Sequence, residues 1–181
     1  MNSDGVRKCL GKLLTRMEPG LLVPKSPWSP ELQREIERLD PEKDNPSQAL
    51  KSGLLLWNDD LNGCHTLAQG LPDDVGGYLH GVMHRREPDY ANAKYWFRKV
   101  GDHPLFPQMQ AAAIEILGDS EGMDSYRKAL EKSKTWDPFR MVDWCETAKD
   151  ERDVAYLRTL QAIEIQGLTY YWLDQAGIPR P

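Results

Sequence analysis

Apolar residues recur at intervals of three and four along most of the chain, with charged residues between them. This spacing is typical of amphipathic α-helices. No run alternates between apolar and polar residues with turn residues at both ends, so the pattern does not require strands. We therefore expect an all-α fold, in which residues 1–181 form a compact single domain of about eight helices. The helices would be arranged as an irregular bundle or as stacked helical hairpins.

Capping residues and prolines divide this pattern into helical segments. Ser29-Pro30 and Asp137-Pro138 each place a capping side chain before a proline at the first helical position. Gly101 suits the position after a helix end. Near residues 58–60 the chain either continues a helix or breaks it. The segments expected to be helical lie within 1–17 and at about 30–40, 47–58, 60–69, 73–86, 89–100, 107–117, 121–134, 138–149 and 151–175.

Two segments do not follow the helical pattern. Residues 18–30 contain four prolines and several large apolar side chains, so we expect an irregular segment that crosses the domain surface. Residues 176–181, which end in GIPRP, are expected to form a flexible tail.

Composition and charge narrow the classes of function. Hydrophobic residues make up 40% of the chain and charged residues 28%, as in a globular domain. A net charge of −5 provides no basic surface for nucleic acid, and no apolar run approaches the roughly 18 residues of a membrane span. The three cysteines lie far apart and form no C-x-x-C pair, which fits a cytoplasmic location. The oligomeric state does not follow from the sequence.

The chemically capable residues are concentrated in one part of the chain. All four histidines fall between residues 65 and 103. At about 100° per residue, His80, His84 and Glu87 share one strip of the expected helix 73–86 and its end. Between Val75 and His84 this helix carries no charged residue, so we expect both imidazoles to be buried and to need hydrogen-bond partners or a ligand.

The same helix is rich in glycine. Gly76, Gly77 and Gly81 border the histidine strip, and each costs about 0.5–1 kcal/mol relative to alanine inside a helix. Three glycines together indicate that either a neighbouring helix or a ligand comes close to the backbone. His65 lies on the preceding helix, expected at residues 60–69. The short connection between the two would pack that helix antiparallel beside the helix at 73–86. His65 could then meet His80 or His84.

Three interpretations of this group remain open. In the first, His80, His84, Glu87 and His65 hold a divalent metal such as zinc. In the second, His65, His80 and His84 are catalytic or ligand-contacting groups of a small-molecule pocket that needs no metal. The residues expected to contact such a ligand are Asn58, Gln69, Arg85 and Tyr95. In the third, the histidines are satisfied core residues, and the chain is a non-catalytic module that binds other proteins.

The segment HGVMHRREPDYANAKYWFRKVGDHP, together with LLLWNDDLNGCHTLAQ before it, resembles a family of uncharacterised bacterial and fungal proteins. That resemblance implies no role for any residue. A weaker likeness is to tetratricopeptide and Sel1-like helical repeats. It rests on AKYWFRK at residues 93–99 and SYRKAL at residues 125–130, which are separated by about one repeat length.

Overall fold

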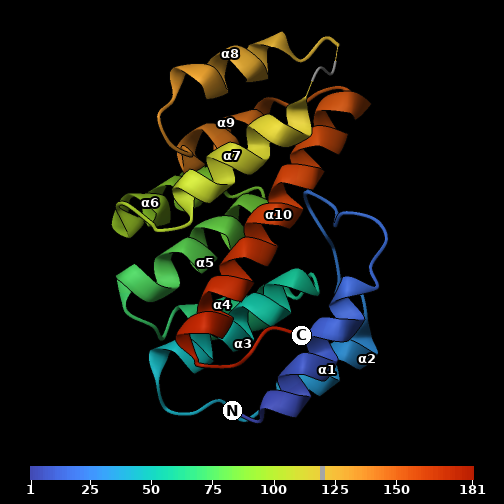
Figure 1. The fold of residues 1–181 in the computed structure, drawn as a ribbon, viewed down its shortest axis with the longest axis vertical. Helices are drawn as coiled ribbons and strands as arrows, with labels where there is room; N and C mark the ends of the chain where they lie inside the picture. The colour runs from blue at the N-terminus through green and yellow to red at the C-terminus, as the bar shows by residue number, and fades with distance from the viewer. Residues whose placement is uncertain (119–120) are drawn as a thin grey trace.

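The structure, a computed structural model, describes residues 1–118 and 121–181, and within these ranges the chain forms ten α-helices and no strand (Figure 1). The all-α expectation is confirmed, and the expected number of about eight is too low. The helices are α1 (Ser3–Leu14), α2 (Pro30–Glu37), α3 (Asn45–Trp57), α4 (Leu61–Ala68), α5 (Asp73–Arg86), α6 (Tyr90–Val100), α7 (Phe106–Leu117), α8 (Asp124–Lys132), α9 (Pro138–Thr147) and α10 (Glu151–Gln175).

The break between α3 and α4 explains part of the higher count. Asp59 has a φ of 64°, a left-handed conformation that no helix continues through. Asp60 follows it and caps α4, because its carboxylate accepts the Gly63 backbone N–H at 2.9 Å. The sequence left open whether a helix continues here, and the structure shows two helices.

Most helix starts agree with the capping residues. The Ser29 hydroxyl accepts the Leu32 N–H at 3.1 Å, and the Asp137 carboxylate accepts the Phe139 N–H at 3.0 Å. The helix expected from Ser47 begins two residues earlier, because the Asp44 carboxylate caps it by accepting the Ser47 N–H at 2.8 Å.

The longest helix, α10, runs along the length of the molecule, and α3 and α5 lie beside it (Figure 1). α10 packs most closely on α3, where a Cβ added to Gly53 would lie 3.0 Å from Thr169 Oγ1. α8 and α9 are at the opposite end of the molecule from α1 and α2. α5 packs between α4 and α6, and every residue of it from Gly76 to Arg86 is buried.

Two of the three glycines of α5, Gly76 and Gly81, are explained by helix packing. A Cβ added to Gly76 would lie 2.5 Å from the Ala68 carbonyl oxygen of α4. A Cβ added to Gly81 would lie 2.5 Å from the Phe97 ring of α6. The sequence allowed either a neighbouring helix or a ligand to approach the backbone here. At both positions the structure shows a neighbouring helix.

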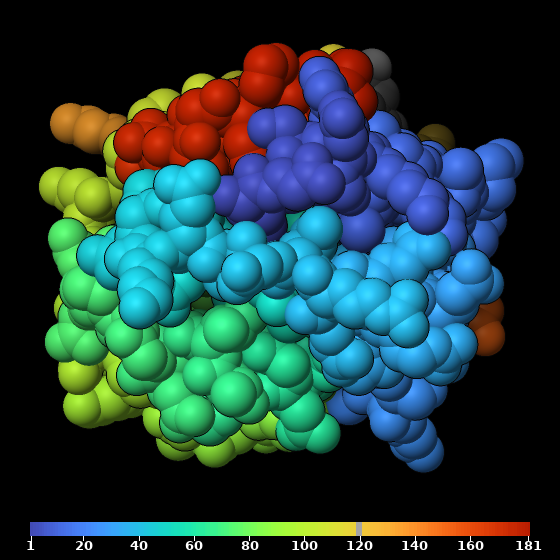
Figure 2. Space-filling model, turned by 90° about the horizontal axis from the view of Figure 1, so that it is seen from below, coloured from blue at the N-terminus to red at the C-terminus, as the bar shows by residue number. Residues whose placement is uncertain are grey.

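The N-terminal helix is amphipathic, as its spacing predicts, and its buried face ends at Leu13. Val6, Cys9, Leu10 and Leu13 are buried, whereas Leu14 is 50% exposed and Met17 is 93% exposed. Leu14 is the last residue of α1, and Met17 lies beyond the end of the helix and so does not continue its apolar face. Figure 2 shows this N-terminal region beside the C-terminal residues, and both chain ends lie at one end of the molecule.

The two non-helical segments contact the body of the domain. Residues 18–29 cross between α1 and α2, where the Trp28 N–H donates to the Asn58 carbonyl at 2.8 Å. At the other end of the chain, Ile178 is buried and Arg180 forms an ion pair with Asp174 at 2.6 Å. None of the helices in the described ranges has the length and apolar character needed to cross a membrane.

Candidate functional site

Three histidines from two adjacent helices form one cluster. His65 lies on α4, and His80 and His84 lie one turn apart on α5. One ligand nitrogen from each ring can be chosen so that all three lie within 4.8 Å of one another. The ring centroid of His65 is 4.8 Å from that of His80 and 5.5 Å from that of His84. The close contact of Gly76 with α4 brings the two helices near enough for this meeting.

α6 supplies a wall to the cluster. The Trp96 indole stacks on the His80 ring with centroids 4.0 Å apart and planes only 4° from parallel. His80 is also parallel to His84, at 5.4 Å and 8°. These contacts restrict the His80 ring to one plane, which preorganises its nitrogens.

The hydrogen bonds of the cluster are unevenly distributed. Asn92 of α6 places its amide nitrogen 3.1 Å from His84 Nε2, and Glu87 places a carboxylate oxygen 3.3 Å from His84 Nδ1. By contrast, the buried His80 Nδ1 has no hydrogen-bond partner among the residues that the structure describes. Buried polar atoms are usually paired, so this nitrogen needs an explanation.

Burial keeps the imidazoles of His80 and His84 uncharged. Burial lowers the pKa of His80 to about 4, and the neighbouring His65 and His84 add to this shift. Burial also lowers the pKa of His84, against the opposing effect of Glu87. At neutral pH both rings are therefore in the neutral form, which is the form that coordinates metal ions.

The geometry fits a metal ion after a small adjustment. Zinc–nitrogen bonds of about 2.0–2.1 Å in a tetrahedral site place the nitrogens roughly 3.3 Å apart. The cluster therefore has to contract from its spacing of up to 4.8 Å, which side-chain rotation can provide. Because Asn92 and Glu87 contact both nitrogens of His84, an ion would replace one of them. The partner that remains would orient the ring.

A polar pocket borders the cluster through Glu87. Its volume is about 570 Å³, and Glu87 lines it as well as contacting His84. Four carboxylates and two cationic side chains line it, so the pocket is acidic. The carboxylates belong to Asp59, Asp60, Glu87 and Asp89, and the cations are Lys25 and Arg86.

Among the residues expected from the sequence, the structure brings His65, His80, His84 and Glu87 together. Two others are engaged elsewhere. The Asn58 amide exchanges hydrogen bonds with the Ser29 backbone at 3.2 and 3.0 Å. Arg85 forms an ion pair with Glu164 at 2.5 Å. Asn58 lies in the turn after α3, where it binds the segment before α2, and Arg85 is on the side of α5 that contacts α10.

The remaining two expected ligand residues lie at the surface. Gln69 is exposed at the end of α4, and Tyr95 is exposed on the outer side of α6, with its ring 5.5 Å from that of Trp96. Asn92 and Trp96 were not expected at the site. They are one helical turn apart on α6 and therefore lie on the same face of that helix. This spacing was the feature of the sequence that could have indicated that the two side chains contact the same site.

The fourth histidine, His103, lies outside the cluster. It is buried among Tyr78, Phe106 and Tyr171, and its Nδ1 accepts the Leu105 N–H at 3.2 Å. Burial lowers its pKa to about 4. The folded protein thus holds this imidazole neutral over a pH range in which the unfolded chain protonates it.

This burial predicts acid destabilisation. An unfolded histidine titrates near 6.5, so the stabilisation from the neutral form of His103 is complete above that pH. It is lost as the pH falls to about 4. Urea unfolding of wild type and His103→Gln at pH 7 and pH 4.5 measures the effect. We expect the wild type to lose about 1–3 kcal/mol more than the variant between the two pH values. Equal losses would contradict this account of His103.

Comparison of the chain with protein-family models, curated proteins and solved structures found no match. Within the described residues, the fold and the cluster define an all-helical protein with a cluster of three histidines, in which His80 and His84 are buried and His65 is half-buried.

Proposed function

We propose that the chain binds one divalent transition-metal ion, zinc being the best fit, through His65, His80 and His84. The ion would in turn bind a small polar molecule. The observation that carries this proposal is the convergence of three imidazoles on one point, with ligand nitrogens within 4.8 Å. Imidazole nitrogen is a preferred ligand of zinc, copper, iron and nickel, and three histidines form a known type of open zinc site.

The unpaired His80 Nδ1 favours a metal over a purely structural role. A core histidine that only holds helices in register has its polar atoms satisfied by the protein. His80 is buried and neutral, and its Nδ1 has no partner in the described part of the chain. A metal ion would bind a nitrogen lone pair in this cluster. Apolar packing of the helices alone would leave the His80 Nδ1 without a partner.

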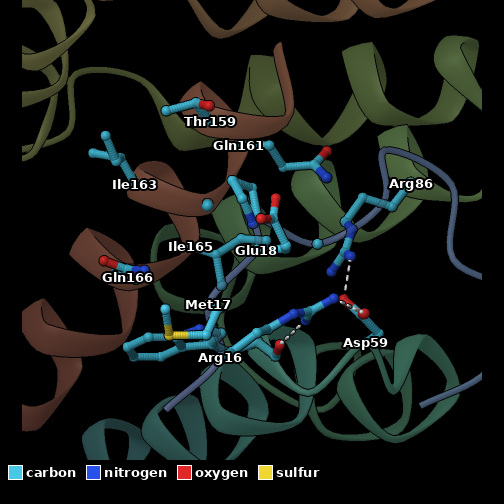
Figure 3. Close-up of a pocket in the computed structure, with 14 residues that line it drawn as sticks. Arg16, Met17, Glu18, Asp59, Arg86, Thr159, Gln161, Ile163, Ile165 and Gln166 are labelled. Atoms are coloured by element: carbon cyan, nitrogen blue, oxygen red, sulfur yellow. Dashed lines mark hydrogen bonds and ion pairs between the residues drawn. The ribbon is translucent and has the colours of Figure 1, made fainter. Parts of the chain in front are cut away.

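The position of the cavities favours a metal over a metal-free histidine pocket. Neither the acidic pocket nor the cavity shown in Figure 3 has a histidine in its wall. The imidazoles therefore contact one another, and none of them contacts the space that a free ligand would occupy in these two cavities. Glu87 links them to the acidic pocket, so a molecule in that pocket would reach the ion from the Glu87 side.

Three protein ligands leave a fourth position on a tetrahedral ion. Zinc lowers the pKa of water bound at such a position to about 7 and polarises carbonyl groups. Hydrolysis of a small polar molecule is the chemistry that this arrangement supports. The acidic wall of the neighbouring pocket favours neutral or cationic molecules over anions.

Titration of metal-free, untagged protein with Zn²⁺ and Ni²⁺ by calorimetry tests the proposal. We expect one ion per chain with a Kd of about 1 µM or tighter. Replacement of both His80 and His84 by alanine is expected to weaken binding by roughly 100-fold or more, because two of three ligands are lost.

The matched control is His103→Gln, which removes the one histidine outside the cluster and should bind metal as the wild type does. Circular dichroism establishes that each variant is folded. Absence of metal binding by the wild type would overturn the proposal. Undiminished binding by the folded double variant would also overturn it, because the ion would then lie elsewhere.

A further inference from the structure

A second cavity, away from the histidine cluster, has a wall built of buried charged and amide side chains (Figure 3). Its volume is about 200 Å³. It lies where the chain leaving α1, the turn between α3 and α4, the end of α5 and the middle of α10 meet. The residues used below are Arg16, Gly20, Asp59, Arg86, Gln161 and Ala162.

The centre of this wall has more cationic than anionic groups. The Arg16 and Arg86 guanidinium groups both donate to the single carboxylate of Asp59, with Arg16 Nη2 2.7 Å from Asp59 Oδ2. Arg86 and Asp59 are buried, and Arg16 is mostly buried. Glu18 also lines the cavity, but it is exposed and therefore screened by solvent. The buried part of the wall thus carries an excess of one positive charge.

Two residues of the wall have unsatisfied polar atoms. Arg86 Nε, a donor, and Gln161 Oε1, an acceptor, are buried and lack hydrogen-bond partners among the described residues. The Gln161 amide nitrogen is held by the Leu21 carbonyl at 3.2 Å, which fixes the side chain. A ligand that complements this wall therefore offers both an anionic acceptor and a donor.

The chain segment after α1 is shaped to cover the ion pair. A Cβ added to Gly20 would lie 3.1 Å from Arg16 Nη2 and 3.1 Å from Asp59 Oδ1, so a larger residue would press on both groups. Arg158 of α10 holds this segment in place by donating to the Gly20 carbonyl at 3.1 Å. The rest of the wall includes the apolar side chains of Met17, Trp57 and Ile163, together with the polar side chains of Thr159 and Gln166.

We propose that this cavity binds a short-chain hydroxycarboxylate. The carboxylate accepts from the unpaired Arg86 Nε and from an Arg16 N–H that Asp59 and the Trp57 carbonyl leave free. The hydroxyl donates to Gln161 Oε1, and the hydrocarbon chain contacts the apolar side chains of the wall. Arginine suits a carboxylate because its guanidinium is always charged and carries five N–H donors, so both residues can donate to the ligand while they keep their contacts with Asp59. The volume is below the roughly 300–1,000 Å³ of pockets for drug-sized ligands, which limits the ligand to a small molecule.

Saturation-transfer NMR and calorimetry with 2-hydroxyisovalerate test this site. The metal is removed first, so that chelation at the histidine cluster does not contribute. We expect a Kd of about 1 mM. The uncharged amide of the same acid is expected to bind roughly tenfold more weakly because it lacks the carboxylate. Isovalerate is also expected to bind more weakly, because it lacks the hydroxyl.

Two variants locate the binding. Arg16→Gln should weaken binding roughly tenfold while Asp59 keeps its contact with Arg86. Ala162→Leu fills the cavity without changing charge and should abolish binding. Arg7→Gln, an exposed arginine on α1 paired with Asp4, is the control and should bind as the wild type does. Failure of the wild type to saturate, or undiminished binding by folded Ala162→Leu, would overturn the proposal.

Discussion

Replacement of Glu164 by glutamine is expected to lower the free energy of unfolding by about 3–5 kcal/mol. Glu164 is fully buried, and its carboxylate accepts hydrogen bonds from Arg85 at 2.5 Å, Tyr78 at 2.9 Å and Trp136 at 3.2 Å. Arg85 is also buried, and its Nε and Nη1 have no hydrogen-bond partner among the described residues, so Glu164 is the one carboxylate that its Nη2 contacts there. Loss of the carboxylate charge would leave a buried guanidinium without compensation.

Urea denaturation at pH 7 measures this effect, and two further variants define its cause. Glu31→Gln removes a carboxylate that lies 3.6 Å from Lys12 at the surface, and it should change stability by less than about 1 kcal/mol. The double variant Arg85→Met with Glu164→Gln removes both charges and should recover part of the loss. If Glu164→Gln were as stable as the wild type, the buried ion pair would not hold α5 to α10 as described.

The second large effect is expected at Gly81, where Gly81→Ala should destabilise the protein by about 2–3 kcal/mol. Alanine normally stabilises a helix relative to glycine, by about 0.5–1 kcal/mol. Here its Cβ would lie 2.5–2.8 Å from three atoms of the Phe97 ring, which is itself buried. Either the ring or the α5–α6 contact would have to shift.

Gly77→Ala provides the matched control, because it makes the same substitution one turn earlier in the same helix. A Cβ at Gly77 would meet only Val100 Cγ2 at 3.4 Å and the Trp96 carbonyl oxygen at 3.7 Å. We expect this variant to match or exceed the wild type in thermal denaturation. A Gly81→Ala protein as stable as Gly77→Ala would contradict the close packing of α5 on α6.

The helical spacing of the sequence was sufficient to predict part of the candidate site. A repeat of 3.6 residues places His80, His84 and Glu87 on one strip wherever the helix lies in the fold. The short connection to the preceding helix made a meeting with His65 a reasonable expectation, and the structure confirms it. The caps at Ser29 and Asp137 were predictable for the same reason, because each depends on a few neighbouring residues.

Contacts between distant segments were not predictable in this way. Arg85 and Glu164 are 79 residues apart, and nothing in the spacing of either helix selects the other as a partner. The arginine next to a histidine strip suggested a ligand contact, whereas the structure uses it in a buried ion pair. The glycines of α5 indicated a close approach, but only the fold shows that Phe97 and the Ala68 carbonyl are what approach.

Anomalous diffraction from crystals of the metal-free protein soaked in zinc, recorded on both sides of the zinc absorption edge, tests the central proposal most directly. We expect one strong peak within about 2.0–2.2 Å of a nitrogen of each of His65, His80 and His84. The three rings would have rotated inward, and one contact of His84 would have been replaced. A map with no peak between the rings, while His84 keeps both Asn92 and Glu87 as partners, would contradict the proposed metal centre.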